Sequence, residues 1–93
     1  RRLMTNRLSD HEYRVAKYYI RISEYEPAMK RLIHLVNTYP SAPTEEDAYV
    51  LLVESILELG GRKDIANAYL AELRRLYPDN GDIRSLQRQI DRQ

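Results

Sequence analysis

Apolar side chains recur at three- and four-residue steps along most of the chain, which is the spacing of one face of an α-helix. Turn signals rich in Gly, Pro, Ser and Asn interrupt this pattern at residues 23–24, 39–43, 59–61 and 77–81. The interruptions divide the sequence into five segments, and each segment has the pattern of a helix. Because the connections are short, we predict an all-α protein of about five antiparallel, stacked helices.

The first two segments carry one apolar stripe each. In the first segment, which we expect to form a helix running unbroken from Arg1, the stripe consists of Met4, Leu8, His11, Val15, Tyr18 and Ile22. In the second segment it consists of Tyr25, Ala28, Leu32, Leu35, Val36 and Tyr39. Each stripe predicts an amphipathic helix.

The third segment is apolar on two faces. One face consists of Ala48, Leu51, Leu52, Ser55 and Leu59, and the other of Tyr49, Val53 and Ile56. Such a helix needs cover on both sides, so we predict that it is sandwiched within the stack. We expect Thr44 to be its N-cap, with its hydroxyl accepting a backbone N–H, while the acidic residues 45–47 favour the positive end of the helix dipole.

The last two segments end the predicted stack. The fourth, from about Asp64 to Tyr77, is expected to bury Ala66, Tyr69, Leu70, Leu73 and Leu76. The fifth begins near Asn80 and has only a narrow apolar stripe of Ile83, Leu86 and Ile90. A helix that is otherwise polar suits the end of a solenoid, where one face meets water.

Two halves of the sequence repeat each other. The pairs Tyr39-Pro40 and Tyr77-Pro78 lie 38 residues apart, close to the roughly 34-residue period of a tetratricopeptide repeat. Small and large residues recur at equivalent places, as in Ala16 and Tyr19, Ala28 and Leu32, and Ala66 and Leu70, with the glycines 60–61 at a helix–helix turn. We therefore predict one tetratricopeptide-like domain over residues 1–93, with repeats at about 8–42 and 43–80 and a capping helix at about 81–93.

Charge and composition exclude several classes of partner and chemistry. Fifteen Lys and Arg against fourteen Asp and Glu give a net charge of +1, so no large field draws the chain to nucleic acid, and we expect no nucleic-acid partner. The absence of cysteine removes disulfides and thiolate chemistry from these residues, without excluding an oxidising compartment. The longest apolar run, which includes residues 49–53, is far shorter than the roughly 20 residues of a membrane span.

Two motifs resemble catalytic or ligand-binding signatures but do not complete them. His11-Glu12 begins like the zinc motif H-E-x-x-H, but Val15 occupies the second ligand position. The glycines 60–61 lack the spacing of a phosphate-binding loop and suit a helix end. A hydrolase or metal enzyme using His11, Glu12 or the acids 45–47 would need these groups to converge, which their spacing does not suggest. We therefore expect neither an enzyme nor a cofactor.

A basic strip of Lys30, Arg31 and His34 lies on the polar side of the second predicted helix. Such a strip is either a solvated face or an interface, and the planar guanidinium of Arg31 suits a bidentate pair with a partner carboxylate. These three residues are our candidate partner-binding site. Lys17 occupies the place where peptide-clamp repeats keep Asn, so we expect no capture of a C-terminal carboxylate.

Several short motifs together resemble the BamD family, the tetratricopeptide lipoproteins of the outer-membrane β-barrel assembly machinery. They are Leu8-x-x-His11-Glu12-x-x-Val15-Ala16-x-Tyr18-Tyr19, Tyr25-x-x-Ala28-x-x-Arg31, Tyr39-Pro40, Asp47-Ala48 and residues 51–55. The resemblance covers nearly the whole sequence. The sequence is similar to the C-terminal part of the family's proteins. It implies an interaction scaffold at the periplasmic face of the cell outer membrane.

The resemblance also implies partners. These are the periplasmic POTRA domains of the barrel subunit BamA, accessory assembly lipoproteins and unfolded outer-membrane proteins, with Arg31 at the position associated with the BamA contact. The matching residues His11, Glu12, Tyr18 and Tyr19 are expected to be mostly structural. The alternative is another periplasmic tetratricopeptide adaptor outside this machinery.

Two features depart from the family. Ser23-Glu24 replaces a turn that usually contains glycine, which leaves the geometry of that turn open. The lipidated N-terminal cysteine through which the family contacts the membrane is not among these residues.

Overall fold

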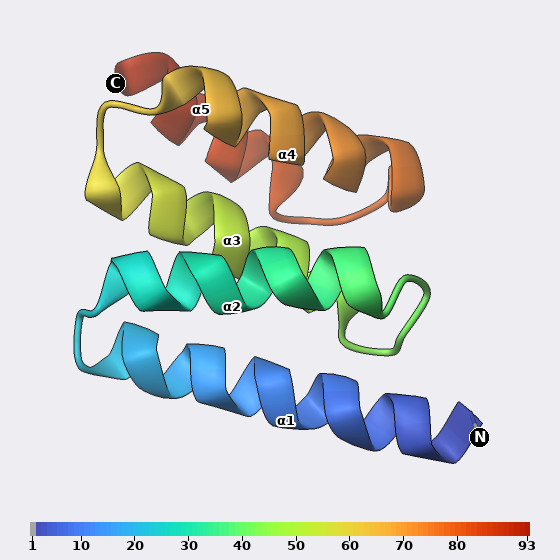
Figure 1. The fold of residues 1–93 in the computed structure, drawn as a ribbon. Coiled ribbons are helices and arrows are strands. Elements are labelled where there is room, and N and C mark those ends of the chain that lie inside the picture. Colours follow the sequence, from blue (N-terminus) through green and yellow to red (C-terminus); the bar gives the residue numbers. More distant parts are fainter. Residues whose placement is uncertain (1) are drawn as a thin grey trace.

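The computed structural model describes residues 2–93, with side chains described from Arg7 onward. In this part of the chain the helices are α1 (Arg2–Arg21), α2 (Tyr25–Thr38), α3 (Glu45–Leu59), α4 (Lys63–Leu76) and α5 (Ile83–Arg92). α1 to α4 stack in chain order as antiparallel neighbours, and α5 packs against α4 and α3 (Figure 1). The predicted all-α, tetratricopeptide-like fold is confirmed. The division into repeats and one domain stays a prediction.

The second helices of the two predicted repeats, α2 and α4, bury equivalent residues. Ala28, Leu32 and Leu35 of α2 are completely buried, and their counterparts 38 positions later are Ala66, Leu70 and Leu73, each at most 1% exposed. The small alanine lets the neighbouring helix approach, and the leucines fill the remaining space. Tyr39 and Tyr77 follow the two helices at the same offset, and each donates its backbone N–H to a carbonyl of the preceding turn.

α3 is the central helix. It packs against α2, α4 and α5, which cover both of its apolar faces. Ala48, Leu52 and Ser55 are buried on one face, and Tyr49, Val53 and Ile56 on the other. The predicted sandwiched helix is confirmed.

The apolar stripe predicted for α1 is not the face that packs. Leu8, Tyr18 and Ile22 are about half exposed, and the side chain of Met4 lies outside the described residues. The buried positions are Ser9 and Ala16, while Tyr13 and Ile20 pack against the core. Because small residues permit close approach of α2, they decide which face of α1 is buried.

The N-terminus of α3 corrects the predicted capping bond of Thr44. Thr44 is the N-cap, but its hydroxyl makes no capping bond and instead lies 3.0 Å from the hydroxyl of Ser9. The acids that follow hold the turn between α4 and α5: Tyr77 Oη donates to Glu45 Oε1 at 2.6 Å, and Asn80 Nδ2 donates to Glu46 Oε2 at 2.7 Å. These carboxylates therefore join distant parts of the chain in addition to starting the helix.

The two helix–helix turns each have a residue with positive φ at the equivalent position, and Gly60 in the second turn has a further positive φ of 77°. Ser23 has φ 62°, and Gly61 at the equivalent place has φ 71°. Both values lie in the left-handed region that favours glycine. Ser23 thus adopts the conformation for which glycine is suited, which resolves the geometry of this turn.

The C-terminal helix confirms the predicted narrow stripe. Ile83, Leu86 and Ile90 are buried, and the remaining side chains of α5 are exposed or partly exposed. The helix begins at Ile83 instead of near Asn80, because Asn80 side-chain oxygen accepts the backbone N–H of Asp82 and keeps this segment in a turn. Within residues 2–93, none of the helices combines the length and hydrophobicity that a bilayer span requires.

Candidate partner-binding groove

The three predicted partner-binding residues lie along one groove between α1 and α2. Lys30, Arg31 and His34 come from α2, and Glu12, Tyr19 and Pro27 complete the lining. The groove has a volume of about 440 Å³. His34 lies four positions after Lys30 and three after Arg31, which is the spacing of one helix face, so the strip read from the sequence becomes one wall of a concave surface.

Arg31 is oriented by a carboxylate of the neighbouring helix. Its Nη1 donates to Glu12 Oε1 at 3.1 Å, and the two side chains are 45% and 15% exposed. This is the one hydrogen bond that Arg31 side chain makes within residues 7–93. A guanidinium has five N–H donors, so the half-exposed fork retains donors for a second carboxylate.

His34 and Lys30 flank this pair. The His34 Nδ1 lies 3.3 Å from Thr38 Oγ1, and its ring meets Tyr39 edge-on at 6.3 Å between centroids. The Lys30 side chain is exposed and has no ion pair within residues 7–93. With two cations, Lys30 and Arg31, against the single carboxylate of Glu12 in its lining, the groove favours an acidic partner group.

Sequence reasoning did not place Glu12 and Tyr19 in the candidate site. Both line the groove, and Tyr19 also contacts the ring of Tyr18 at 5.9 Å. His11 and Tyr18 are exposed on α1, and the expectation that they are mostly structural stays a prediction. Glu12 and Tyr19 belong to the same sequence motif as His11 and Tyr18, and this was the available signal for a shared site. The motif does not show how α1 is rotated against α2, so it could not tell which of the four residues face the groove.

The groups considered for catalysis do not converge. Glu45 binds Tyr77 and Glu46 binds Asn80, while His11 is exposed on α1. Among the side chains of residues 7–93, no group of three His, Asp or Glu is placed to hold a metal ion. What the geometry offers is a surface of oriented charges.

Comparison with known proteins gives one family. Residues 2–78 match the family model described as YfiO, outer membrane lipoprotein. No solved structure matches the chain. The match covers α1 to α4, including every residue of the groove, and leaves α5 outside. Since it spans most of the sequence, the chain belongs to the YfiO family of outer membrane lipoproteins, the BamD family that its motifs resemble.

Proposed function

We propose that the chain is a protein–protein interaction scaffold in the assembly of outer-membrane β-barrel proteins. It docks on the periplasmic domains of BamA and on accessory lipoproteins, with unfolded outer-membrane proteins as a further partner. It works at the periplasmic face of the outer membrane and catalyses no reaction. In this proposal its membrane contact is a lipid anchor on a cysteine that is not among the 93 residues.

The observation that carries the proposal is the Arg31–Glu12 pair in the groove of an outer membrane lipoprotein family member. Glu12 engages Nη1 of Arg31 and restricts the motion of the side chain. A carboxylate of BamA can then pair with the remaining donors at a lower cost in side-chain entropy. Lys30 adds positive charge at the rim of the groove, which raises the association rate more than the final affinity.

The test is binding of the protein to the isolated periplasmic domains of its cognate BamA at low and high salt. Arg31→Glu should weaken binding at least about tenfold, because it replaces an attraction at the centre of the contact with a repulsion. Higher salt should weaken binding of the wild type more than that of the variant, since it screens the charges at the rim. Calorimetry measures both effects.

Two controls separate docking from folding. Arg14→Glu makes the same charge change on an exposed residue of α1 outside the groove, and it should change binding less than about threefold. The double variant Glu12→Arg/Arg31→Glu retains an ion pair between the helices but moves the cation to α1. If this swap binds BamA as tightly as the wild type, Arg31 is not the contact.

The result for the wild-type protein decides whether it acts in the β-barrel assembly machinery. No binding to BamA by the folded protein would refute the proposed docking and favour another periplasmic tetratricopeptide adaptor role. Equal losses for Arg31→Glu and Arg14→Glu would attribute the binding to general charge attraction and remove the groove from the interface.

A further inference from the structure

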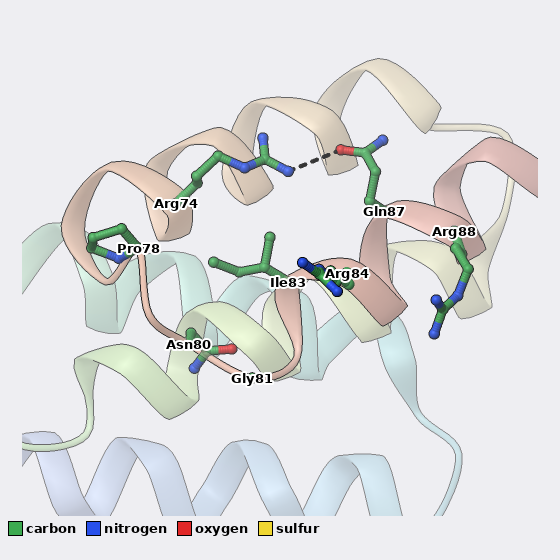
Figure 2. Close-up of a pocket in the computed structure, with 8 residues that line it drawn as sticks. All are labelled: Arg74, Pro78, Asn80, Gly81, Ile83, Arg84, Gln87 and Arg88. Atoms are coloured by element: carbon green, nitrogen blue, oxygen red, sulfur yellow. Dashed lines mark hydrogen bonds between the residues drawn. The ribbon is translucent and has the colours of Figure 1, made fainter.

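A second groove lies at the other end of the stack, between α4, α5 and the turn that joins them (Figure 2). Its volume is about 510 Å³. Three of its lining side chains are arginines, Arg74, Arg84 and Arg88, and none is acidic. It shares no residue with the groove around Arg31, and α5 lies beyond the part of the chain that matches the family.

One arginine of this groove is held in place by a relay of hydrogen bonds. Arg74 Nη2 donates to Gln87 Oε1 at 3.2 Å, and Gln87 Nε2 donates to Asp91 Oδ1 at 3.1 Å. Figure 2 shows the first of these bonds spanning the space between α4 and α5. The Gln87 amide therefore holds the guanidinium of α4 against α5.

The other two arginines both belong to α5. Arg84 and Arg88 are four residues apart on α5 and so lie on the same side of that helix. Within residues 7–93, neither forms an ion pair. Two carboxylates of this region have other partners: Asp91 accepts from Gln87, and Glu46 accepts from Asn80. Two exposed cations thus project beside a third that is already oriented.

A small apolar surface lies among these cations, supplied mainly by the exposed Pro78, because Ile83 is only 8% exposed. Pro78 and Ile83 line the groove, and Figure 2 shows the Ile83 side chain between Arg74 and Arg84. Apolar contact combined with guanidinium groups suits a peptide that carries both apolar and carboxylate side chains. A nucleic acid or a membrane surface would need a longer basic surface, whereas this chain has a net charge of only +1.

We propose that the groove between α4 and α5 docks an acidic segment of a partner protein. Its carboxylates pair with Arg84 and Arg88, and an apolar side chain of the segment packs on Ile83 and Pro78. The inference rests on the proposed function only in treating the chain as a protein-binding scaffold. The contact is separate from the Arg31 groove, so one copy of the chain can hold two partner segments.

The probe is a short fluorescein-labelled peptide in which leucines are flanked by pairs of glutamates, followed by fluorescence anisotropy. Arg84→Gln/Arg88→Gln should weaken its binding at least about tenfold, as expected for the loss of two charge-assisted pairs. Glutamine keeps a helix propensity close to that of arginine, so α5 should remain folded, which circular dichroism checks. The same peptide with glutamine in place of glutamate should bind at least about tenfold more weakly to the wild type.

The matched control is Arg14→Gln/Arg62→Gln, which removes the same charge from exposed residues outside this groove. It should change the affinity less than about twofold. Arg31→Glu should leave peptide binding unchanged, so a failure of the BamA proposal and a failure of this one are distinguishable.

Four outcomes would overturn the proposal. They are no binding of the glutamate peptide to folded wild type, equal binding of the glutamine peptide, an equal loss in the matched control, and displacement of the peptide by inorganic phosphate or phosphatidylglycerol vesicles at comparable concentration. The last result would make the groove a site for small anions or lipid headgroups.

Discussion

The first helices of the two predicted repeats, α1 and α3, bury matching small residues but differ on their other face. Ser9 and Ala16 of α1 correspond to Ala48 and Ser55 of α3, 39 positions later, and all four are at most 1% exposed. The second face of α3 is covered by neighbouring helices, whereas α1 leaves Leu8, Tyr18 and Ile22 about half exposed. Burial of an apolar side chain therefore depends on which helices lie beside it, and a periodic stripe alone does not decide it.

The test of this comparison with the largest expected effect replaces one leucine in α3 and one in α1. Leu52→Ala in α3 should destabilise the protein by about 2–5 kcal/mol, because Leu52 is completely buried and its removal leaves a cavity. Leu8→Ala in α1 should change stability by less than about 0.5 kcal/mol, because Leu8 is already half exposed. Urea unfolding monitored by circular dichroism measures both. Equal losses would mean that the outer face of α1 is covered in solution.

The second test compares the tyrosines that follow α2 and α4. Tyr77 donates to the buried carboxylate of Glu45, while the hydroxyl of Tyr39 has no hydrogen-bond partner within residues 7–93. Tyr77→Phe should cost about 1.5–3 kcal/mol, because it leaves a charged acceptor buried without this donor. Tyr39→Phe should be close to neutral. A similar cost for the two variants in chemical unfolding would contradict the assigned role of the Glu45 bond.

The same pair predicts a dependence on pH. Burial, together with the hydrogen bond to Glu45, raises the pKa of Tyr77 from 10.0 to about 12. A group whose pKa is raised on folding stabilises the fold fully below its unfolded pKa and loses that contribution as pH rises through the folded pKa. The difference in stability between wild type and Tyr77→Phe should therefore be constant below pH 10 and shrink towards pH 12. Urea unfolding of both proteins between pH 10 and pH 12 measures this difference in stability. A difference that stayed constant over this range would contradict the prediction.

The third test overpacks the second helices, where the two repeats are alike. Ala28→Leu and Ala66→Leu each insert a large side chain at a position with no exposed surface, so each should cost about 1–3 kcal/mol. Because the two alanines occupy equivalent sites, the two losses should agree within about 0.5 kcal/mol. Thermal unfolding of the two variants checks this. A much larger loss at one site would show that α2 and α4 do not pack equivalently.

Sequence periodicity predicted the elements well because each helix is a local structure. Most of the buried set of α2 and of the two faces of α3, and the stripe of α5, follow from side-chain spacing alone, although the buried Met29 of α2 was not part of its predicted stripe. The buried face of α1 could not be predicted in this way, since it depends on Ser9 and Ala16, whose small size matters only once α2 lies beside them.

Only part of the candidate site could be predicted, because side-chain spacing reveals residues on one helix but not pairs that join two helices. Lys30, Arg31 and His34 share one helix face, so their spacing brings them together. The pairing of Arg31 with Glu12 joins residues 19 positions apart, and the bond between Tyr77 and Glu45 joins residues 32 apart. Such pairs depend on the rotation of each helix about its own axis, which tertiary packing sets. The basic groove at α5 also went unnoticed, because its arginines come from two helices, Arg74 from α4 and Arg84 and Arg88 from α5.

The smallest expected effect concerns the turns within the two repeats. Ser23 and Gly61 share the left-handed conformation, and a Cβ added at Gly61 would meet no atom within 4 Å, so the difference between them is one of backbone strain. Ser23→Gly should stabilise the protein by about 0.5 kcal/mol, because relief of this strain exceeds the extra entropy that glycine gives the unfolded chain. Gly61→Ser should destabilise it by about 0.5–1 kcal/mol. If Ser23→Gly instead lowers the urea midpoint, the serine hydroxyl stabilises the turn by more than its backbone conformation costs.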